Sequence, residues 1–275
     1  MNNTHWEYKY AELIRDVLTT GEKRHTRAGD AYSVFGRALE VDISKEFPLL
    51  RGRKMFPGPI FGELAAMLRG PKHVQDFRDQ GCNYWESWAD GQGELALDYG
   101  NAWIDFNGVN QLEVLVNTLK TNPTDRRMIV TGWRPDRLDQ LSLPCCHILY
   151  QWYVRKNKDG ADYLDMIWYQ RSVDVMVGLP SDIVLAAMWT MLLANECGFQ
   201  PGKVTMMLGD THVYANHSEG VNDYLRNLNN RAVETFGTLI HYTLDKSATV
   251  FNFTPDMMRI NNYAHAPAIK FSLNV

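Results

Sequence analysis

The sequence predicts an α+β fold in a single domain, and three observations support this prediction. Strand-like runs and helical segments follow each other at unequal spacing, unlike the regular alternation of a βαβ protein. The chain has 275 residues, of which 45% are hydrophobic, enough to bury one large core or two small ones. Proline and glycine are dispersed, and no repeat or low-complexity linker divides the sequence. We therefore expect residues 1–275 to form one domain.

Helical periodicity marks four segments: residues 5–19, 60–69, 111–121 and 183–197. The last segment is apolar nearly all round rather than on one face. This pattern predicts a helix buried at the centre of the domain.

Runs rich in aromatic and β-branched residues predict four strands: residues 127–133, 147–155, 163–172 and 203–209. The sequence Asn157-Lys158-Asp159-Gly160 separates the second and third runs and is typical of a hairpin turn. We therefore expect these two strands to be antiparallel neighbours.

Composition and charge narrow the classes of partner. The net charge is −4, and the 28 basic residues form no tail or stripe, so we expect no nucleic-acid polymer as a partner. The N-terminus lacks the basic start and apolar run of a signal peptide, and the apolar stretch 183–193 is too short to cross a bilayer. The four cysteines show no metal-ligand spacing. We expect a cytoplasmic protein without a membrane segment or a structural metal.

The pair Cys146-His147, at the start of a predicted strand, is the first candidate site. A cysteine beside a histidine could be an activated nucleophile. Free cysteines are more often small buried hydrophobes, and from these two residues alone that interpretation is favoured.

Two further polar groups lie at strand ends. Arg126 and Arg127 precede a predicted strand and could grip a phosphate, although a solvated loop is the more usual reason for such a pair. Gln170, Arg171, Ser172 and Asp174 close another strand, where so many polar residues are unusual for a core.

His212 and Tyr214 form a third group. They alternate on one face if the strand that contains residues 203–209 continues. They could hydrogen-bond a sugar hydroxyl, or they could be a packed histidine and tyrosine of the core.

The order and spacing of these motifs resemble the thymidylate synthase family over most of the chain. The segments that carry the resemblance are Thr26-Arg27-Ala28-Gly29, Gly62-Glu63-Leu64, Tyr84-Trp85-Glu86-Ser87-Trp88-Ala89-Asp90, Asp98-Tyr99-Gly100, and the four groups above. The resemblance implies a large mixed β-sheet flanked by helices, and an obligate sheet-to-sheet homodimer with shared active sites. It also implies a pyrimidine nucleoside monophosphate as substrate and the folate 5,10-methylenetetrahydrofolate as cosubstrate.

The resemblance also implies a role for individual residues. Cys146 resembles the nucleophile that adds to C6 of the pyrimidine, and Glu63 and Tyr99 resemble the groups that manage protons around the base. The expected nucleotide contacts are Arg27, Arg126, Arg127, Gln170, Arg171, Ser172, Asp182, His212 and Tyr214, with the Arg126-Arg127 pair supplied by the partner subunit. The expected folate contacts are Trp85, Trp88, Asp174, Gly178 and Val275.

Asp182 is the informative departure, because thymidylate synthases have asparagine at this position. Asparagine accepts from N3–H of uracil and donates to O4, whereas cytosine presents the opposite pattern. A protonated aspartic acid donates to cytosine N3 and accepts from N4, and an ionised one accepts from N4 and from a protonated N3. From local sequence alone, Ser181 or Asp182 after Pro180 is better explained as the N-cap of the helix that follows. The resemblance instead favours base recognition, and it points to the dCMP hydroxymethylase branch of the family.

The expected product is therefore 5-hydroxymethyl-dCMP. Segments 51–59 and 263–269 depart from the family pattern, which indicates altered closure over the folate. A dCMP methyltransferase, a thymidylate synthase converting dUMP to dTMP, and a CMP hydroxymethylase are the alternatives. A catalytically retired nucleotide-binding protein is the non-enzymatic alternative, and the intact set of site residues argues against it. A cysteine hydrolase is disfavoured because His147 should face away from Cys146 on the strand.

Overall fold

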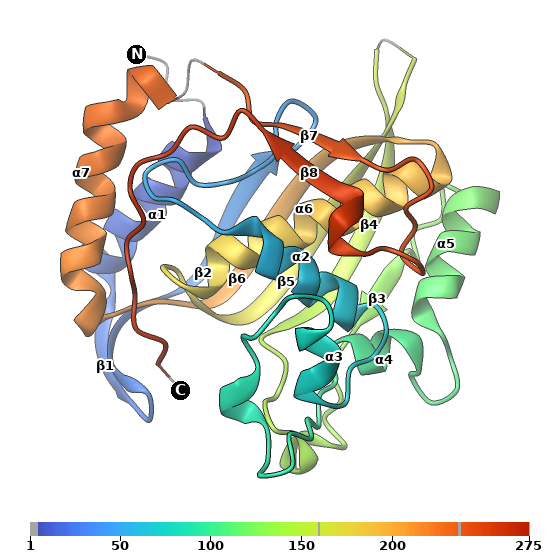
Figure 1. The fold of residues 1–275 in the computed structure, drawn as a ribbon, viewed down its shortest axis with the longest axis horizontal. Helices are drawn as coiled ribbons and strands as arrows, with labels where there is room; N and C mark the ends of the chain where they lie inside the picture. Colours follow the sequence, from blue (N-terminus) through green and yellow to red (C-terminus); the bar gives the residue numbers. More distant parts are fainter. Residues whose placement is uncertain (1–4, 159, 236–237, 275) are drawn as a thin grey trace.

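The fold is built around a six-stranded mixed sheet in the order β1-β2-β6-β5-β4-β3 (Figure 1). The computed structural model describes residues 5–158, 160–235 and 238–274. The strands of the sheet are β1 Glu22–Thr26, β2 Gly29–Asp42, β3 Ile129–Thr131, β4 His147–Lys156, β5 Asp162–Asp174 and β6 Gln200–Tyr214. Strands β5 and β6 are parallel, and the other neighbouring strands of this sheet are antiparallel. A second, two-stranded sheet pairs β7 His241–Leu244 with β8 Met258–Asn261.

Helices cover one face of the large sheet in two layers (Figure 1). The helices are α1 Trp6–Thr20, α2 Pro57–Met67, α3 Val74–Arg78, α4 Gly100–Ile104, α5 Gln111–Thr121, α6 Gly178–Cys197 and α7 Ser218–Thr235. Helix α6 packs on β5 and β6, and α2 packs on α6. The α+β fold with a large mixed sheet flanked by helices is therefore confirmed.

Helix α6 is the central element of the core. The Trp189 indole on α6 lies 4.9 Å from the Tyr150 ring and 5.0 Å from the Trp152 ring, both on β4, and 4.3 Å from the Trp103 ring. Among the described residues, α6 is the one helix long and apolar enough to cross a membrane, with a mean hydropathy of 1.2. Because 83% of this span is buried inside the fold, packing against the sheet accounts for its apolar composition.

The predicted elements form, with shifted ends. The segments predicted at 5–19 and 111–121 become α1 and α5, and the one at 60–69 begins earlier as α2. The segments at 147–155 and 163–172 become the antiparallel pair β4 and β5. In the turn between them, Asn157 N donates to Ala161 O at 3.0 Å; Asp159 lies outside the described residues. The run at 127–133 shortens to β3, and the run at 203–209 lengthens to β6 at both ends.

A distortion at one level of the sheet positions the polar residues of interest. Pairing is interrupted without a change of register opposite Gly36 on β2, Gly209 on β6 and Arg171 on β5. Gly36 has φ +73°, and a Cβ at Gly209 would lie 2.6 Å from the carbonyl oxygen of Arg171, so glycine suits both positions. The buried positions of β6 change phase at this point, from even-numbered to odd-numbered residues. The even-numbered residues that follow, 210, 212 and 214, therefore face away from the core.

Candidate active site

Cys146 lies directly before β4 and is held there by its backbone. Arg171 N donates to Cys146 O at 2.8 Å, and Cys146 N donates to the Tyr99 hydroxyl at 2.8 Å. The Arg171 guanidinium donates to Cys145 O at 2.7 Å through Nε and to Pro144 O at 2.9 Å through Nη2. Arg171 thus clamps the segment that carries the thiol.

The surroundings of the Cys146 thiol act in opposite directions on its pKa. Burial raises this pKa, while the Arg171 guanidinium and the Tyr99 hydroxyl lower it. His147 is fully buried, and burial lowers the pKa of its imidazole to about 3. Its Nδ1 contacts the Tyr150 hydroxyl. His147 is therefore unsuited to be the base for Cys146, and Arg171 supplies the local positive charge instead.

Asp182 lies inside α6, not at its start. The helix begins at Gly178 with Val177 as its N-cap residue, so the N-cap interpretation of Asp182 is wrong. Asp182 is 8% exposed, and Gln170 Nε2 donates to its Oδ2 at 2.6 Å. Gln170 Oε1 is buried without a hydrogen-bond partner among the described residues. Gln170 Oε1 and the Asp182 carboxyl group could thus both hydrogen-bond a ligand, as expected in a site that binds the polar edge of a heterocyclic ring.

Glu63 on α2 forms a second buried carboxyl group near Asp182. Burial raises the pKa of Asp182 to about 7. Burial, and to a smaller extent the charge of Asp182, raise the pKa of Glu63 to about 8. The hydrogen bond from Trp85 Nε1 to Glu63 Oε1, at 2.9 Å, lowers this pKa but does not offset the rise. Because the two groups interact, they titrate as a pair. The pair holds protons near neutral pH, which suits proton transfer.

The two raised pKa values predict how the stability of the ligand-free protein depends on pH. Each raised pKa means that the folded state holds its proton more tightly than the unfolded state. Below the ordinary pKa of about 4, both groups are protonated in the folded and unfolded states, and their contribution to the free energy of unfolding is fully present. As pH rises through the folded value of about 7 for Asp182, the buried proton is lost and this stabilisation disappears. Between pH 5 and pH 8.5, we expect the free energy of unfolding of Asp182→Asn to rise relative to that of wild type by on the order of 1 to 4 kcal/mol.

Urea unfolding of both proteins at the two pH values measures this difference. Exposed Asp136→Asn is the control, since that carboxyl group has a lowered pKa. A pH-independent difference between wild type and Asp182→Asn would contradict the raised pKa.

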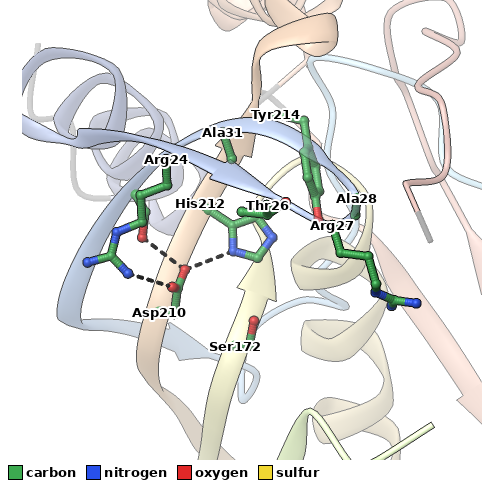
Figure 2. A pocket seen from close by; sticks show the side chains of 10 residues that line it. Arg24, Thr26, Arg27, Ala28, Ala31, Ser172, Asp210, His212 and Tyr214 are labelled. Carbon is green, nitrogen blue, oxygen red and sulfur yellow. Dashed lines mark hydrogen bonds and ion pairs between the residues drawn. The ribbon is translucent and has the colours of Figure 1, made fainter.

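A cavity of about 240 Å³ opens beside the β1–β2 hairpin and the ends of β5 and β6 (Figure 2). Its lining residues are Arg24, Thr26, Arg27, Ala28, Ala31, Ser33, Ser172, Asp210, His212 and Tyr214. Ser172 lines the cavity and directly follows Arg171, whose backbone N donates to Cys146 O, so the cavity lies near the segment that carries the thiol. Two arginines and a serine hydroxyl suit a phosphate, and the His212 and Tyr214 side chains suit a sugar.

The structure thus brings most of the predicted residues into one region. The Cys146 group, the carboxyl pair and the cavity contain Arg27, Glu63, Tyr99, Cys146, Gln170, Arg171, Ser172, Asp182, His212 and Tyr214. Arg24, Ser33 and Asp210 were not assigned roles from the sequence, although all three line the cavity. The signal for Asp210 was its place two residues before His212 on the same strand.

The predicted arginine pair lies elsewhere in the chain. Arg126 and Arg127 are exposed and precede β3, the edge strand farthest from the β1–β2 hairpin. Arg127 Nη2 lies 2.7 Å from Asp125 Oδ2. Neither arginine lines the cavity of its own chain.

The predicted folate contacts have separate local environments. The Trp85 indole stacks on the Phe77 ring at 5.3 Å and lies 5.5 Å from the Trp88 indole, next to Glu63. Asp174 Oδ1 accepts from Met176 N at 2.8 Å in the turn before α6. A Cβ at Gly178 would lie 3.6 Å from Asp182 Oδ2. Val275 lies outside the described residues.

A comparison with protein families agrees with this geometry. The family described as thymidylate synthase matches residues 8–275. The match covers nearly the whole chain, including every group of site residues described above.

Proposed function

The chain belongs to the thymidylate synthase family, and from this premise we propose that it converts dCMP to 5-hydroxymethyl-dCMP with 5,10-methylenetetrahydrofolate as cosubstrate. Membership of the family implies folate-dependent transfer of a one-carbon unit to a pyrimidine nucleotide. The choice of dCMP depends on one observation, the buried Asp182 carboxyl group whose pKa lies at about 7.

Asp182 supports cytosine because a single proton satisfies both partners. Oδ2 already accepts from Gln170, so a protonated carboxyl group can donate to cytosine N3 and accept from the N4 amino group. If the proton moves to N3, the ionised carboxylate accepts from both nitrogens, and the total number of protons is unchanged. Uracil carries its own N3–H and an O4 acceptor. With the Asp182 proton on Oδ1, its N3–H would meet that donor and its O4 would meet the lone pairs of Oδ2. Because binding of uracil would leave these buried groups unpaired, the site should discriminate strongly between cytosine and uracil.

Cys146 begins the reaction. Its sulfur adds to C6 of the cytosine ring, and the electron pair of the C5–C6 double bond moves into the ring, toward N3. A hydrogen bond from Asp182 stabilises that charge. C5 then becomes nucleophilic enough to form the new carbon–carbon bond. The folate supplies the electrophilic one-carbon unit.

Glu63 is placed to manage the C5 proton. Its pKa of about 8 lies near neutral pH, so the carboxyl group can both take and return a proton. Loss of the C5 proton expels tetrahydrofolate and leaves a methylene group at C5. The oxygen of water then adds to the methylene carbon and its proton passes to solvent, while Cys146 leaves C6 as a thiolate and the aromatic ring reforms. Trp85 and Trp88, two indole rings beside Glu63, fit a flat heteroaromatic donor and would hold the folate.

The two segments that depart from the family pattern contact each other, so their departures would act together on closure over the folate. The Tyr263 hydroxyl donates to Leu50 O at 2.6 Å and accepts from Met55 N at 2.8 Å. The 51–59 loop is thereby tied to the C-terminal tail, the two elements in which altered closure over the folate was expected. Methylation of dCMP by hydride transfer is the second candidate, because Trp85 and Trp88 are both retained.

The identity of the product tests this proposal. We expect dCMP and methylenetetrahydrofolate to give a nucleotide heavier by one CH₂O, with tetrahydrofolate as the other product. Mass spectrometry of the nucleotide and absorbance of the folate measure both. A nucleotide heavier by only CH₂, together with dihydrofolate, would establish methylation instead. Turnover of dUMP but not dCMP would refute the assignment of Asp182.

We also propose that a second copy of the chain covers the free face of the sheet. The side chains of Ile129, Tyr153, Ile167, Tyr169 and Met207 project from four neighbouring strands, and each is between 37% and 62% exposed. They point away from α6, since the alternate residues of the same strands are buried against it. Such an exposed apolar surface is typical of a protein interface. A sheet-to-sheet dimer would also explain the arginine pair before β3.

Complementation between two inactive variants tests the shared site. We expect Cys146→Ala and Arg127→Ala to be inactive alone, because one lacks the nucleophile and the other a phosphate contact in trans. Mixed dimers should regain activity, since one of their two sites combines intact Cys146 with intact Arg127. Activity of the mixture after co-refolding measures this. The combination of Cys146→Ala with Ser172→Ala is the control, because under this proposal both residues serve the site of their own subunit. Recovery in the control but not in the test mixture would contradict the proposal.

A further inference from the structure

We infer that Asp210 is a positioning residue for the sugar: it holds a proton on Nδ1 of His212, so that Nε2 accepts a hydrogen bond from the 3′-hydroxyl of the nucleotide. The inference rests on the proposed nucleotide site. Asp210 and His212 lie two residues apart on β6, after the change of phase, and both line the cavity (Figure 2).

The contacts of Asp210 define where the protons lie. Its Oδ1 accepts from Ser33 Oγ at 2.9 Å and lies 3.0 Å from His212 Nδ1. Arg24 Nη1 lies 3.5 Å from Oδ2. The hydrogen bond with His212 lowers the pKa of Asp210, so the carboxyl group is ionised at neutral pH. An ionised carboxylate has no proton to donate, and the proton of the His212 contact therefore belongs to Nδ1.

The tautomer decides what His212 can recognise. A neutral imidazole with its proton on Nδ1 has a lone pair on Nε2 and accepts from a hydroxyl group. With the proton on Nε2, the same ring would donate, and the hydroxyl oxygen would have to turn so that it accepts instead. The Tyr214 ring lies edge-on to His212 at 5.1 Å and completes the wall of the cavity. Asp210 thus determines whether His212 accepts a hydrogen bond from the hydroxyl group or donates one to it.

The tautomer can be measured on the protein without any nucleotide. Long-range proton–nitrogen NMR correlations of the histidine rings should show a protonated Nδ1 and an unprotonated Nε2 for His212 at pH 8. Loss of one set of signals in His212→Ala assigns the ring. In Asp210→Asn the side-chain amide can donate to Nδ1, so we expect the proton to move to Nε2. A protonated Nε2 in the neutral ring of wild type would overturn the inference.

The role in sugar recognition is tested by removing the hydroxyl group from the ligand. Wild type should bind dCMP about 10-fold more tightly than the 2′,3′-dideoxy nucleotide, the effect of one buried hydrogen bond. Asp210→Asn should reduce this preference, because the hydroxyl group must then turn to accept from Nε2, while it binds the dideoxy nucleotide as wild type does. Ser33→Ala is the matched control, because it removes another partner of Asp210 but leaves the His212 contact. It should keep the preference.

The outcomes separate this inference from the proposed function. Binding of neither nucleotide by wild type would overturn the proposed function and the sugar role together, whereas the tautomer result needs no ligand. Tight binding by wild type with an unchanged preference in Asp210→Asn would overturn the role of Asp210 alone. His212→Ala and the double variant Asp210→Asn/His212→Ala should show the same preference, because Asp210 acts on the sugar only through His212. A difference between these two variants would also overturn the inference.

Discussion

Replacing Cys146 by alanine should reduce release of the C5 proton of dCMP by about 10⁴-fold or more, the usual effect of deleting a covalent nucleophile. Without sulfur addition at C6, the electron pair of the C5–C6 bond stays in the ring, and C5 does not attack. Arg171 clamps the backbone of residues 144–146, so the fold around the site should survive the change. Release of tritium from 5-labelled dCMP in the presence of methylenetetrahydrofolate measures the loss.

The neighbouring cysteine provides a matched control. Cys145 is buried, and its thiol contacts Gly132 O at 3.5 Å. Cys145→Ala removes the same atoms one residue away, and we expect it to cost about 1 kcal/mol of stability while leaving tritium release within a few-fold of wild type. If wild type and Cys146→Ala release tritium equally slowly, the chain is a nucleotide-binding protein and not an enzyme.

The predictable part of the fold is the part with strong local patterns. Helix α6 is apolar nearly all round, and β4 and β5 are joined by a short polar turn, so each was evident from the sequence. Strand β1 was missed because all of its residues are exposed and show no alternation. Strand β2 was missed because its burial pattern is interrupted at the sheet distortion near Gly36. Partner strands stabilise these segments, and local preference does not reveal such partners.

The site shows the same division between local and tertiary information. The Cys146-His147 pair alone favoured a buried thiol without a catalytic role. The imidazole is indeed buried, with its pKa lowered to about 3, and the charge near the thiol comes from Arg171 on another strand. Local sequence favoured Asp182 as a helix cap because it does not show that α6 begins at Gly178. The resemblance placed both residues in the site. The roles of Arg24 and Asp210 depend on contacts between strands, which no single segment contains.

Asp182→Asn should reverse the choice of nucleotide, changing the ratio of kcat/KM for dCMP to that for dUMP by about 10⁴-fold. The asparagine side chain accepts from N3–H of uracil and donates to O4 through its amide, but it meets cytosine with a donor opposite a donor. Initial rates with each nucleotide, over a range of concentrations, give the ratio.

The pH dependence distinguishes recognition of the base from a general loss of activity. The complex of wild type with dCMP needs the proton shared by Asp182 and N3, so kcat/KM for dCMP should fall about tenfold per pH unit well above the pKa of about 7. Asp182→Asn has no such proton, and its kcat/KM for dUMP should not follow that decline. Asp98→Asn is the control, since Asp98 is also a buried carboxyl group with a raised pKa but lies beside Arg137. A reversal of preference in Asp98→Asn, or none in Asp182→Asn, would show that Asp182 does not read the base. Conversely, a reversal confined to Asp182→Asn requires the carboxyl group to contact the pyrimidine edge, because loss of stability alone would reduce the rates with both nucleotides together.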